Sequence, residues 1–340
     1  MEEGTLYDVV IIGAGPAGLT AAIYTGRALL STLVLEKTVP GGQLNETEFV
    51  ENYPGFEEKV AAAELMDQMR KQAERMGALI TIEQATGIES IDNHYRIEGT
   101  KSTFEARTVI IASGSQPREL PVEGAKRLKG RGVSYCATCD GYFFQGKRVL
   151  EVGAGDSGFE EALFLTKFAE SVGILVRHPE DDPHALRASP ILQRRAKENP
   201  KITFLWNTVV EQVSGEDRLT GVLLKDLATG EVEETKVDGL FVNIGHIPET
   251  DYLRATVELD ENGFVLTDDH LRTNLPGVFA AGDVRIVASR YAQAVVAAGD
   301  GAIAAIEAEK YLADQPFQKP STRHTNRRVH KGGNYGSDDQ

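Results

Sequence analysis

Two glycine-rich loops of the same form constrain this chain more than any other feature. The first, GAGPAG at 13–18, follows the apolar stretch YDVVII, and the second, GAGDSG at 153–158, follows GKRVLEV; a helix-forming stretch comes after each. Strand, glycine turn, helix and second strand make up the βαβ unit that binds dinucleotides. Because the two loops begin 140 residues apart, they predict an α/β chain with two similar Rossmann-like domains. The length of 340 residues agrees, since single cores rarely grow to that size.

The first loop has every part of a dinucleotide site. Gly13 permits the sharp turn, Gly15 lets the backbone approach a pyrophosphate, and the last glycine lets the helix pack against the strand. The helix that begins at Pro16 and Ala17 offers unpaired N–H groups to the phosphates. Glu36 ends the next strand, 23 residues after Gly13, where a carboxylate can accept a hydrogen bond from a ribose hydroxyl. We therefore expect a dinucleotide at this loop.

The second loop is equally complete, but the position that selects its nucleotide is not. A nucleotide there would contact Gly153, Gly155, Asp156 and Ser157. The next strand ends in Val-Arg-His at 176–178, whereas an acid would favour NADH and an arginine cluster would favour the 2′-phosphate of NADPH. Three carboxylates at 180–182 would repel a phosphate unless they point into solvent, and a solvated surface turn is an equally good interpretation.

Both cysteines of the chain lie in the stretch CATCD, at Cys136 and Cys139, with Asp140 directly after. A zinc site needs about four ligands, and neither a second cysteine pair nor a nearby histidine pair supplies them. Two inert buried thiols are an alternative, but they explain neither the spacing nor the carboxylate. A dithiol–disulfide couple explains both, because the thiolate attacks and a neighbouring carboxylate can move the proton. We expect these three residues to be catalytic and expect no metal.

The net charge and the hydropathy of the chain argue against nucleic-acid and membrane partners. A net charge of −15 argues against a nucleic-acid partner. No apolar run is long enough to cross a membrane and no signal-peptide pattern begins the chain, so we expect a cytoplasmic protein without a membrane partner. Residues 315–340 carry five Lys/Arg and two Asp/Glu, against 31 and 49 in the rest of the chain. They are typical of a flexible basic tail.

Four stretches closely resemble the low-molecular-weight bacterial thioredoxin reductases. They are GVSYCATCDG at 132–141, GGQLNETEFVENYPGF at 41–56, IGHIPET at 244–250 and GVFAAGDV at 277–284, and the resemblance runs in the same order from 7 to 312. It implies a homodimeric FAD protein that passes electrons from the flavin to the Cys136–Cys139 disulfide and on to a thioredoxin-like protein.

The resemblance also implies the domain plan. The fold would be α/β, with two Rossmann-like domains of the three-layer ββα type, the second inserted in the first. Residues 1–117 and 247–314 would form the discontinuous FAD-binding domain. Residues 118–246 would form a pyridine-nucleotide-type domain that carries the cysteine pair, and 315–340 the tail. The family alternates between two arrangements by rotating one domain against the other.

The same resemblance implies roles for individual residues. Cys139 would face the flavin, Cys136 would attack the substrate disulfide, and Asp140 would act as acid and base. Glu36 would bind the adenosine ribose, and Asp283 would lie near the ribityl chain. The remaining residues implied at the FAD site are Gly42, Gln43, Leu44, Asn52, Ala85, Ala112, Gly114, Gln293 and Ala294.

The chain departs from this family where NADPH should bind. The family's signature is His-Arg-Arg followed by a further arginine; here Val176 replaces the histidine and His178 the second arginine, so Arg177 and Arg187 remain. Each lost guanidinium–phosphate contact costs on the order of 1.5–3 kcal/mol. We predict that reduced ferredoxin or another donor replaces NADPH. The alternatives are an NADPH-dependent reductase with weak cofactor affinity and a non-catalytic flavin redox sensor or electron carrier.

Two further departures lie towards the C-terminus. The family's Arg-Gln-Ala is Ala-Gln-Ala at 292–294, and the tail at 315–340 has no counterpart in typical members. Ferredoxin–NADP reductases of this fold lay an aromatic ring from such an extension over the flavin. His324 or Tyr335 could do this here, and a disordered tail is the alternative.

Overall fold

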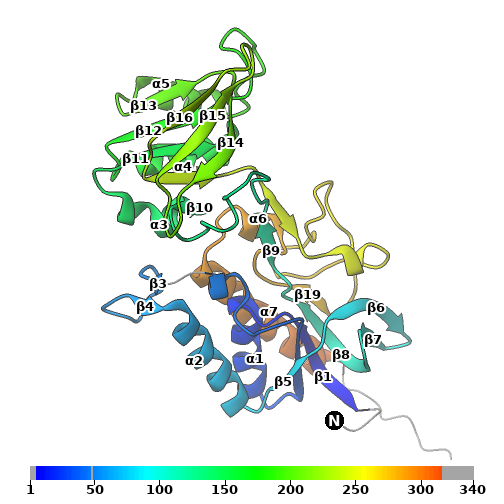
Figure 1. Cartoon of the computed structure of the whole chain (residues 1–340). Coiled ribbons are helices and arrows are strands. Elements are labelled where there is room, and N and C mark those ends of the chain that lie inside the picture. Colours follow the sequence, from blue (N-terminus) through cyan, green and yellow to red (C-terminus); the bar gives the residue numbers. More distant parts are fainter. Residues whose placement is uncertain (1–4, 47–48, 316–340) are drawn as a thin grey trace, which may run out of the picture.

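The computed structural model describes residues 5–46 and 49–315. It has two lobes, each built around a largely parallel sheet (Figure 1). The expectation that His324 or Tyr335 covers the flavin lies outside the described residues. In the part of the chain that the structure describes, no helix combines the length and the apolar character needed to span a bilayer.

The first lobe is built on a seven-stranded sheet. Its path is β5-β2-β1-β8-β7-β6, and β19 pairs with the second half of β8. The strands are β1 (Leu6–Ile12), β2 (Thr32–Glu36), β5 (Leu79–Ile82), β6 (Ala85–Ile91), β7 (His94–Gly99), β8 (Thr103–Ile111) and β19 (Val278–Ala280). All pairs among β5, β2, β1, β8 and β19 are parallel, and β6 and β7 extend the sheet antiparallel. The carboxyl ends of β1, β2, β8 and β19 therefore meet at one edge.

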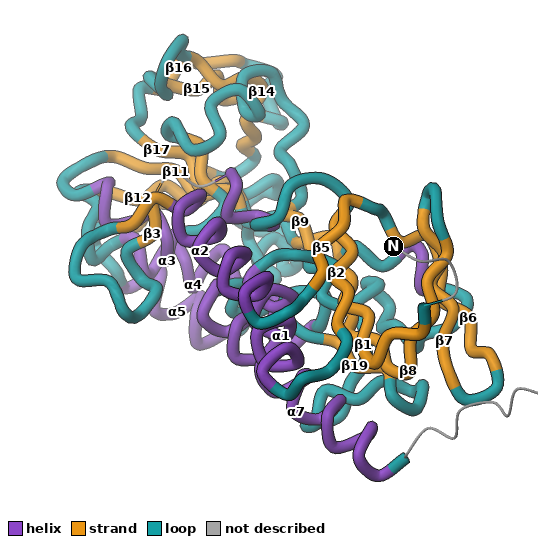
Figure 2. Tube along the Cα trace, turned by 90° about the horizontal axis from the view of Figure 1, so that it is seen from below, coloured by secondary structure: helices purple, strands orange, loops and turns teal. Residues whose placement is uncertain are grey.

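Both faces of this sheet are buried, which explains why its strands are apolar runs without alternation. Val9 and Ile11 pack on one face under helices α1 (Pro16–Arg27), α2 (Ala62–Arg75) and α7 (Ala294–Asp314). Val10 and Ile12 pack on the other face. Figure 2 shows these three helices on the same side of β1, β2 and β8.

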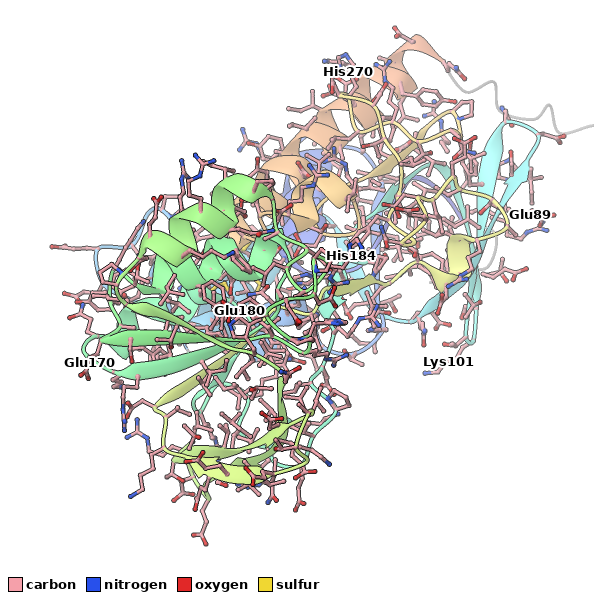
Figure 3. All side chains as sticks on the ribbon, turned by 90° about the horizontal axis from the view of Figure 1, so that it is seen from above. Glu89, Lys101, Glu170, Glu180, His184 and His270 are labelled. Atoms are coloured by element: carbon pink, nitrogen blue, oxygen red, sulfur yellow. A yellow bond between two sulfur atoms is a disulfide. The ribbon has the colours of Figure 1, made fainter. Side chains whose placement is uncertain are left out.

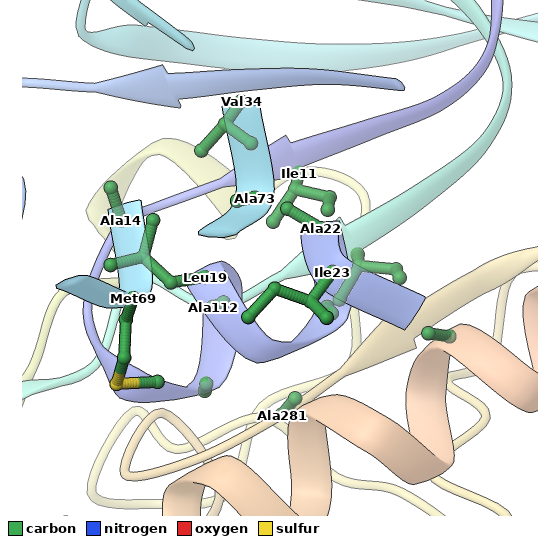
Figure 4. Packing of buried hydrophobic residues seen from close by; sticks show 14 of the residues in the cluster. Ile11, Ala14, Leu19, Ala22, Ile23, Val34, Met69, Ala73, Ala112 and Ala281 are labelled. Atoms are coloured by element: carbon green, nitrogen blue, oxygen red, sulfur yellow. The ribbon is translucent and has the colours of Figure 1, made fainter. Parts of the chain in front are cut away.

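Close packing of α1 on α7 depends on one glycine. A Cβ atom on Gly301 of α7 would lie 2.1 Å from the carbonyl oxygen of Ala17 in α1, so a larger residue would force the helices apart. Around this contact, Leu19, Ala22 and Ile23 of α1 pack with Ile11, Met69 and Ala281 (Figure 4). The start of α1, where the phosphates of a dinucleotide should bind, is thereby held rigidly.

The second lobe repeats the first in smaller form. Its five-stranded parallel sheet has the order β10-β17-β11-β12-β13, and an antiparallel sheet of order β14-β15-β16 packs beside it. The elements are β10 (Val133–Ser134), α3 (Ala137–Asp140), β11 (Arg148–Val152), α4 (Asp156–Leu165), β12 (Ser171–Leu175), α5 (Pro190–Glu198), β13 (Ile202–Leu205), β14 (Thr208–Ser214), β15 (Gly221–Asp226), β16 (Val232–Thr235) and β17 (Gly239–Val242). The expected fold class, with two Rossmann-like units, is confirmed.

A two-stranded link joins the lobes. The chain leaves the first lobe through β9 (Ser115–Pro117) and returns through β18 (His246–Pro248), and these strands pair antiparallel with His246 opposite Pro117. The remaining short elements are β3 (Phe49–Val50), β4 (Val60–Ala61), α6 (Ile286–Ser289) and three 3-10 turns at Gly42–Glu46, Gly141–Phe144 and Asp251–Leu253. The domain boundaries at 117/118 and 246/247 stay predictions.

Candidate active site: a large cavity that faces a disulfide

A cavity of about 940 Å³ lies between the two lobes. The predicted FAD residues that line it are Gly13, Gly15, Pro16, Ala17, Glu36, Gly42, Gln43, Leu44, Asn52, Ala112, Gly114, Asp283, Gln293 and Ala294. Cys136, Cys139 and Asp140 line it from the second lobe. Ala85 is the exception, because it begins β6 and its side chain is buried in the core on the other face of the sheet.

The glycine loop at 13–18 is a preformed cradle. Gly13 has φ +108°, and a Cβ atom there would lie 2.3 Å from the carbonyl oxygen of Ala112, directly after β8. Glu36 Oε2 accepts a hydrogen bond from the N–H of Ala14 at 2.8 Å, and Glu36 Oε1 accepts one from the N–H of Thr38 at 3.1 Å. This carboxylate therefore fixes the loop to the end of β2, and its contact with a ribose stays a prediction.

Asp283 supplies an unpartnered polar group to the same cavity. Its Oδ1 is buried and has no hydrogen-bond partner among the described residues. Burial, with a smaller contribution from Asp300, raises the pKa of Asp283 to about 7. Asp300 itself is paired with Arg285, at 2.6 Å between Oδ2 and Nη1. A polyhydroxyl chain would satisfy this group, so the cradle at one end and Asp283 beyond it fit the pyrophosphate and ribityl parts of FAD.

The raised pKa of Asp283 leads to a prediction for how the stability of the flavin-free protein depends on pH. This pKa is near 3.8 when unfolded and about 7 when folded, so the folded state loses stability as pH rises from about 4 to 7. Asp283→Asn should therefore be more stable than the wild type at pH 8, by on the order of 4 kcal/mol, and equally stable near pH 4. Urea unfolding at both pH values measures this. Asp269→Asn, at an exposed position, is the control, and an equal gain at both pH values would contradict the assignment.

The two cysteines form a disulfide across the first turn of α3, with Cys136 at the N-cap of this helix. Cys136 Sγ accepts a hydrogen bond from the N–H of Cys139 at 3.2 Å. Beside them, Asp140 Oδ2 accepts a hydrogen bond from Ser134 Oγ at 2.6 Å. Burial raises the pKa of Asp140, so this carboxyl keeps its proton to a higher pH than usual. A proton donor thus lies next to the disulfide.

The first lobe also reaches the disulfide. Gln293 Nε2 lies 3.9 Å from Cys136 Sγ, and Gln293 Oε1 accepts a hydrogen bond from Asn52 Nδ2 at 3.0 Å. An ion pair between Lys129 and Glu46 joins the lobes nearby. In this arrangement the disulfide faces the large cavity rather than an approaching protein.

A second cavity, of about 270 Å³, lies at the second glycine loop. Of the residues predicted to contact a nucleotide, Gly153, Gly155, Asp156, Ser157 and Arg187 line it, and Arg177 does not. Asp156 Oδ1 is already engaged, since it accepts a hydrogen bond from the N–H of Ser189 at 2.6 Å.

Among the described residues, Arg177 is the one cation at the selectivity position 176–178 that is left free to contact a phosphate. Val176 is fully buried in the core of the lobe, so it offers nothing to a phosphate. His178 Nδ1 lies 3.0 Å from Asp182 Oδ2, and the exposed Glu180 and His184 belong to the same loop (Figure 3). Arg177 is exposed and has no ion-pair partner in the part of the chain that the structure describes. One of the three carboxylates at 180–182 is therefore held within the loop.

Comparison with known proteins identifies the family. The model of the pyridine nucleotide-disulphide oxidoreductases matches residues 7–301. A thioredoxin reductase of Mycolicibacterium smegmatis is 48% identical over 312 residues, which cover 92% of this chain and 98% of that protein. The chain belongs to the thioredoxin reductase family. It is therefore a flavin-dependent oxidoreductase with FAD as its cofactor, as the sequence predicted.

Solved thioredoxin reductases agree with the fold but differ among themselves. The enzyme from Streptococcus pyogenes is 41% identical, covers 91% of this chain and 99% of its own, and superposes with a TM-score of 0.84. The Lactococcus lactis enzyme, described as an FR conformation, is 43% identical with the same coverage, yet its TM-score is 0.62. Similar sequence with poorer superposition indicates a different overall arrangement in the second case.

Sequence reasoning missed three side chains behind the disulfide. Glu161 of α4 accepts hydrogen bonds from the N–H of Ala137 and from Asn243 Nδ2, and Glu151 of β11 is fully buried. The visible signal was Glu151, a charged residue between the apolar Leu150 and Val152 of β11. Among the described residues, no three His, Cys, Asp or Glu side chains gather to hold a metal ion.

Proposed function

We propose that this thioredoxin reductase reduces the disulfide of a thioredoxin-like protein through Cys136 and Cys139. One observation carries the proposal. The disulfide of the second lobe and the glycine cradle of the first lobe line one cavity. When bound, FAD supplies an electron pair to this disulfide. Dithiol chemistry then needs only the two thiols and a proton donor beside them.

The protein's own groups complete the reaction. Two electrons break the Cys136–Cys139 bond, and Asp140 can give a proton to one of the two sulfurs while Ser134 holds the carboxyl in place. The Cys136 thiolate attacks the partner's disulfide and forms a mixed disulfide, which releases one partner sulfur. Cys139 then attacks Cys136 Sγ, so the intramolecular disulfide re-forms and the partner leaves with two reduced sulfurs. Cys139 is thus assigned to the flavin side and Cys136 to the substrate side.

Substrate access requires one lobe to rotate against the other. The disulfide lines the cavity between the lobes, and Cys136 touches Gln293 of the first lobe, so the first lobe stands in the way of a protein substrate in this arrangement. Two short strands, β9 and β18, connect the lobes, which suits a hinge. The different superpositions of the two solved relatives support a movement of this kind.

We further propose that the electron donor is reduced ferredoxin or another carrier rather than NADPH. Val176 is buried and His178 is bonded to Asp182, so Arg177 and Arg187 are the two cations left for a 2′-phosphate. Arg177 lies off the second cavity. An NADPH-dependent reductase with weak cofactor affinity is the second candidate, which the surviving Arg187 favours.

An anaerobic titration tests the donor. NADPH should bleach the flavin absorbance slowly or not at all, whereas dithionite or reduced ferredoxin should bleach it fully. His178→Arg should restore a phosphate contact and tighten NADPH binding about tenfold. NADH lacks the 2′-phosphate, so its binding to the same variant is the control and should not change. Rapid bleaching of the wild type by micromolar NADPH would refute the altered donor.

The remaining assignments complete the proposal. Residues 1–117 with 247–314 form the FAD domain, and 118–246 form the inserted domain. The protein works as a cytoplasmic homodimer.

A further inference from the structure

A fully buried carboxyl lies behind the redox disulfide. Glu151 is the next-to-last residue of β11, with 0% of its surface exposed. The residues opposite it on the neighbouring strands are Ile174 of β12 and Phe241 of β17, which are both buried and apolar. Neither oxygen of Glu151 has a hydrogen-bond partner in the described part of the chain. An isolated charge would be very costly in such a place.

A second carboxyl connects this position to the cysteine pair. Glu161 Oε2 accepts a hydrogen bond from the N–H of Ala137, at 3.0 Å, and Ala137 stands between Cys136 and Thr138 in the redox turn. The same oxygen accepts a hydrogen bond from Asn243 Nδ2. Glu161 thus ties the redox turn to α4 and to the end of β17.

The surroundings set the charges of the two acids. Burial, with the added repulsion of Glu161, raises the pKa of Glu151 well above its ordinary value. The Asn243 amide, which donates a hydrogen bond to Glu161, has a smaller opposing effect on the pKa of Glu151. Burial raises the pKa of Glu161 to about 7, and Asp140 of α3 contributes in the same direction. No Lys, Arg or His pairs with either acid among the described residues. Glu151 is therefore neutral, and Glu161 changes charge near neutral pH.

We propose that Glu161 is a positioning residue for the redox disulfide, whose uncompensated negative charge opposes reduction of Cys136–Cys139 until Glu161 takes up a proton. This inference rests on the proposed role of the two cysteines. Reduction brings two electrons into the turn that Glu161 holds, and the thiolate left behind repels a neighbouring anion in a poorly solvated site. Above neutral pH, one proton goes to a sulfur and a second goes to Glu161 as the electrons enter. Below neutral pH Glu161 already carries its proton.

The equilibrium between the disulfide and dithiothreitol tests this. The FAD-loaded protein is equilibrated anaerobically with reduced and oxidised dithiothreitol, quenched with a maleimide, and its free thiols are counted by mass spectrometry. Glu161→Gln keeps an oxygen for the N–H of Ala137 but removes the charge. At pH 8.5 the variant should be reduced about tenfold more readily than the wild type, which is ~30 mV for two electrons. At pH 6 the two proteins should agree within about twofold, since both are then neutral at this position.

Matched variants separate charge from structure. Glu160→Gln changes the exposed neighbour on α4 and should match the wild type at both pH values. Glu151→Gln replaces a group that is already neutral, so it should keep the pH dependence of the wild type. An equal shift for Glu161→Gln at pH 6 and 8.5, or no shift at either, would overturn the proposal. The proposal would also be overturned if Glu151→Gln lost the pH dependence of the wild type while Glu161→Gln kept it.

The same experiment distinguishes failure of this inference from failure of the proposed function. It counts thiols and needs neither a thioredoxin-like substrate nor an electron donor. If the wild-type cysteines did not interconvert between disulfide and dithiol, the proposed function would fail. If they did so without the predicted difference between pH values, only the role of Glu161 would fail.

Discussion

Replacing Cys136 with serine should lower the rate of disulfide reduction by roughly 10³-fold or more, while dithionite still reduces the FAD completely. The serine hydroxyl cannot form a mixed disulfide with a protein substrate, so no covalent route to the partner remains. The cavity proposed for FAD should survive, because its cradle belongs to the first lobe and Cys136 only faces it. Turnover is measured with a thioredoxin and a chemical electron donor, and FAD reduction by loss of visible absorbance.

A second variant distinguishes the two sulfurs. Cys139→Ser should also stop turnover, but it should accumulate a mixed disulfide through Cys136, visible as a mass increase equal to the substrate. Thr138→Ser, at the exposed position between the cysteines, should retain activity and serves as the control. Turnover retained by Cys136→Ser, or a trapped complex on Cys139 instead, would reverse the assignment of roles.

Gly13→Ala should remove FAD almost completely and destabilise the first lobe by more than ~3 kcal/mol. Two effects combine at this position. The backbone has φ +108°, which disfavours any side chain, and the new methyl group would lie 2.3 Å from the backbone oxygen of Ala112. That oxygen belongs to the segment after β8 and cannot move without disturbing the sheet. The flavin-to-protein absorbance ratio and the melting temperature report the two losses.

Gly230→Ala is the matched control for this prediction. Gly230 lies in the turn between β15 and β16, has φ +77°, and a Cβ atom there would meet nothing within 4 Å. It therefore carries the backbone strain without the clash and should cost about 1 kcal/mol with full flavin content. Equal losses in both variants would show that backbone strain alone, rather than the close approach of β8, makes Gly13 necessary.

The parts of the site that were predictable from the sequence depend on local patterns. A glycine turn between an apolar strand and a helix specifies its own geometry, so both loops and the end of β2 at Glu36 are found from a few dozen residues. The cysteine pair is equally local. Fourteen predicted residues line one cavity; the local patterns account for those of the first glycine loop and Glu36, and the family resemblance supplied the others. Ala85, also from the resemblance, does not line it, since its place depends on how β6 pairs with β7.

The contacts that could not be predicted join distant segments. Glu161 and Asn243 are 82 positions apart, and Gln293 meets Cys136 across the two lobes. No periodicity or spacing links such pairs, because they arise from the packing of whole sheets. Arg177 is the reverse case, a residue that the sequence singles out but that the structure does not place in the site. The sequence identifies it as a phosphate-binding candidate, but it lies outside the cavity that Arg187 lines.

The pairing of Pro117 with His246 has a consequence for how such an enzyme can change over time. The chain enters and leaves the second lobe at adjacent points, which is the geometry that lets a segment be inserted or exchanged as a unit. A tight turn could replace it without shifting a single strand of the flavin-binding sheet. A lineage could therefore change its electron source by altering the nucleotide loop of that segment, provided that Cys136, Cys139 and Asp140 within it are kept, while the flavin half is inherited unchanged.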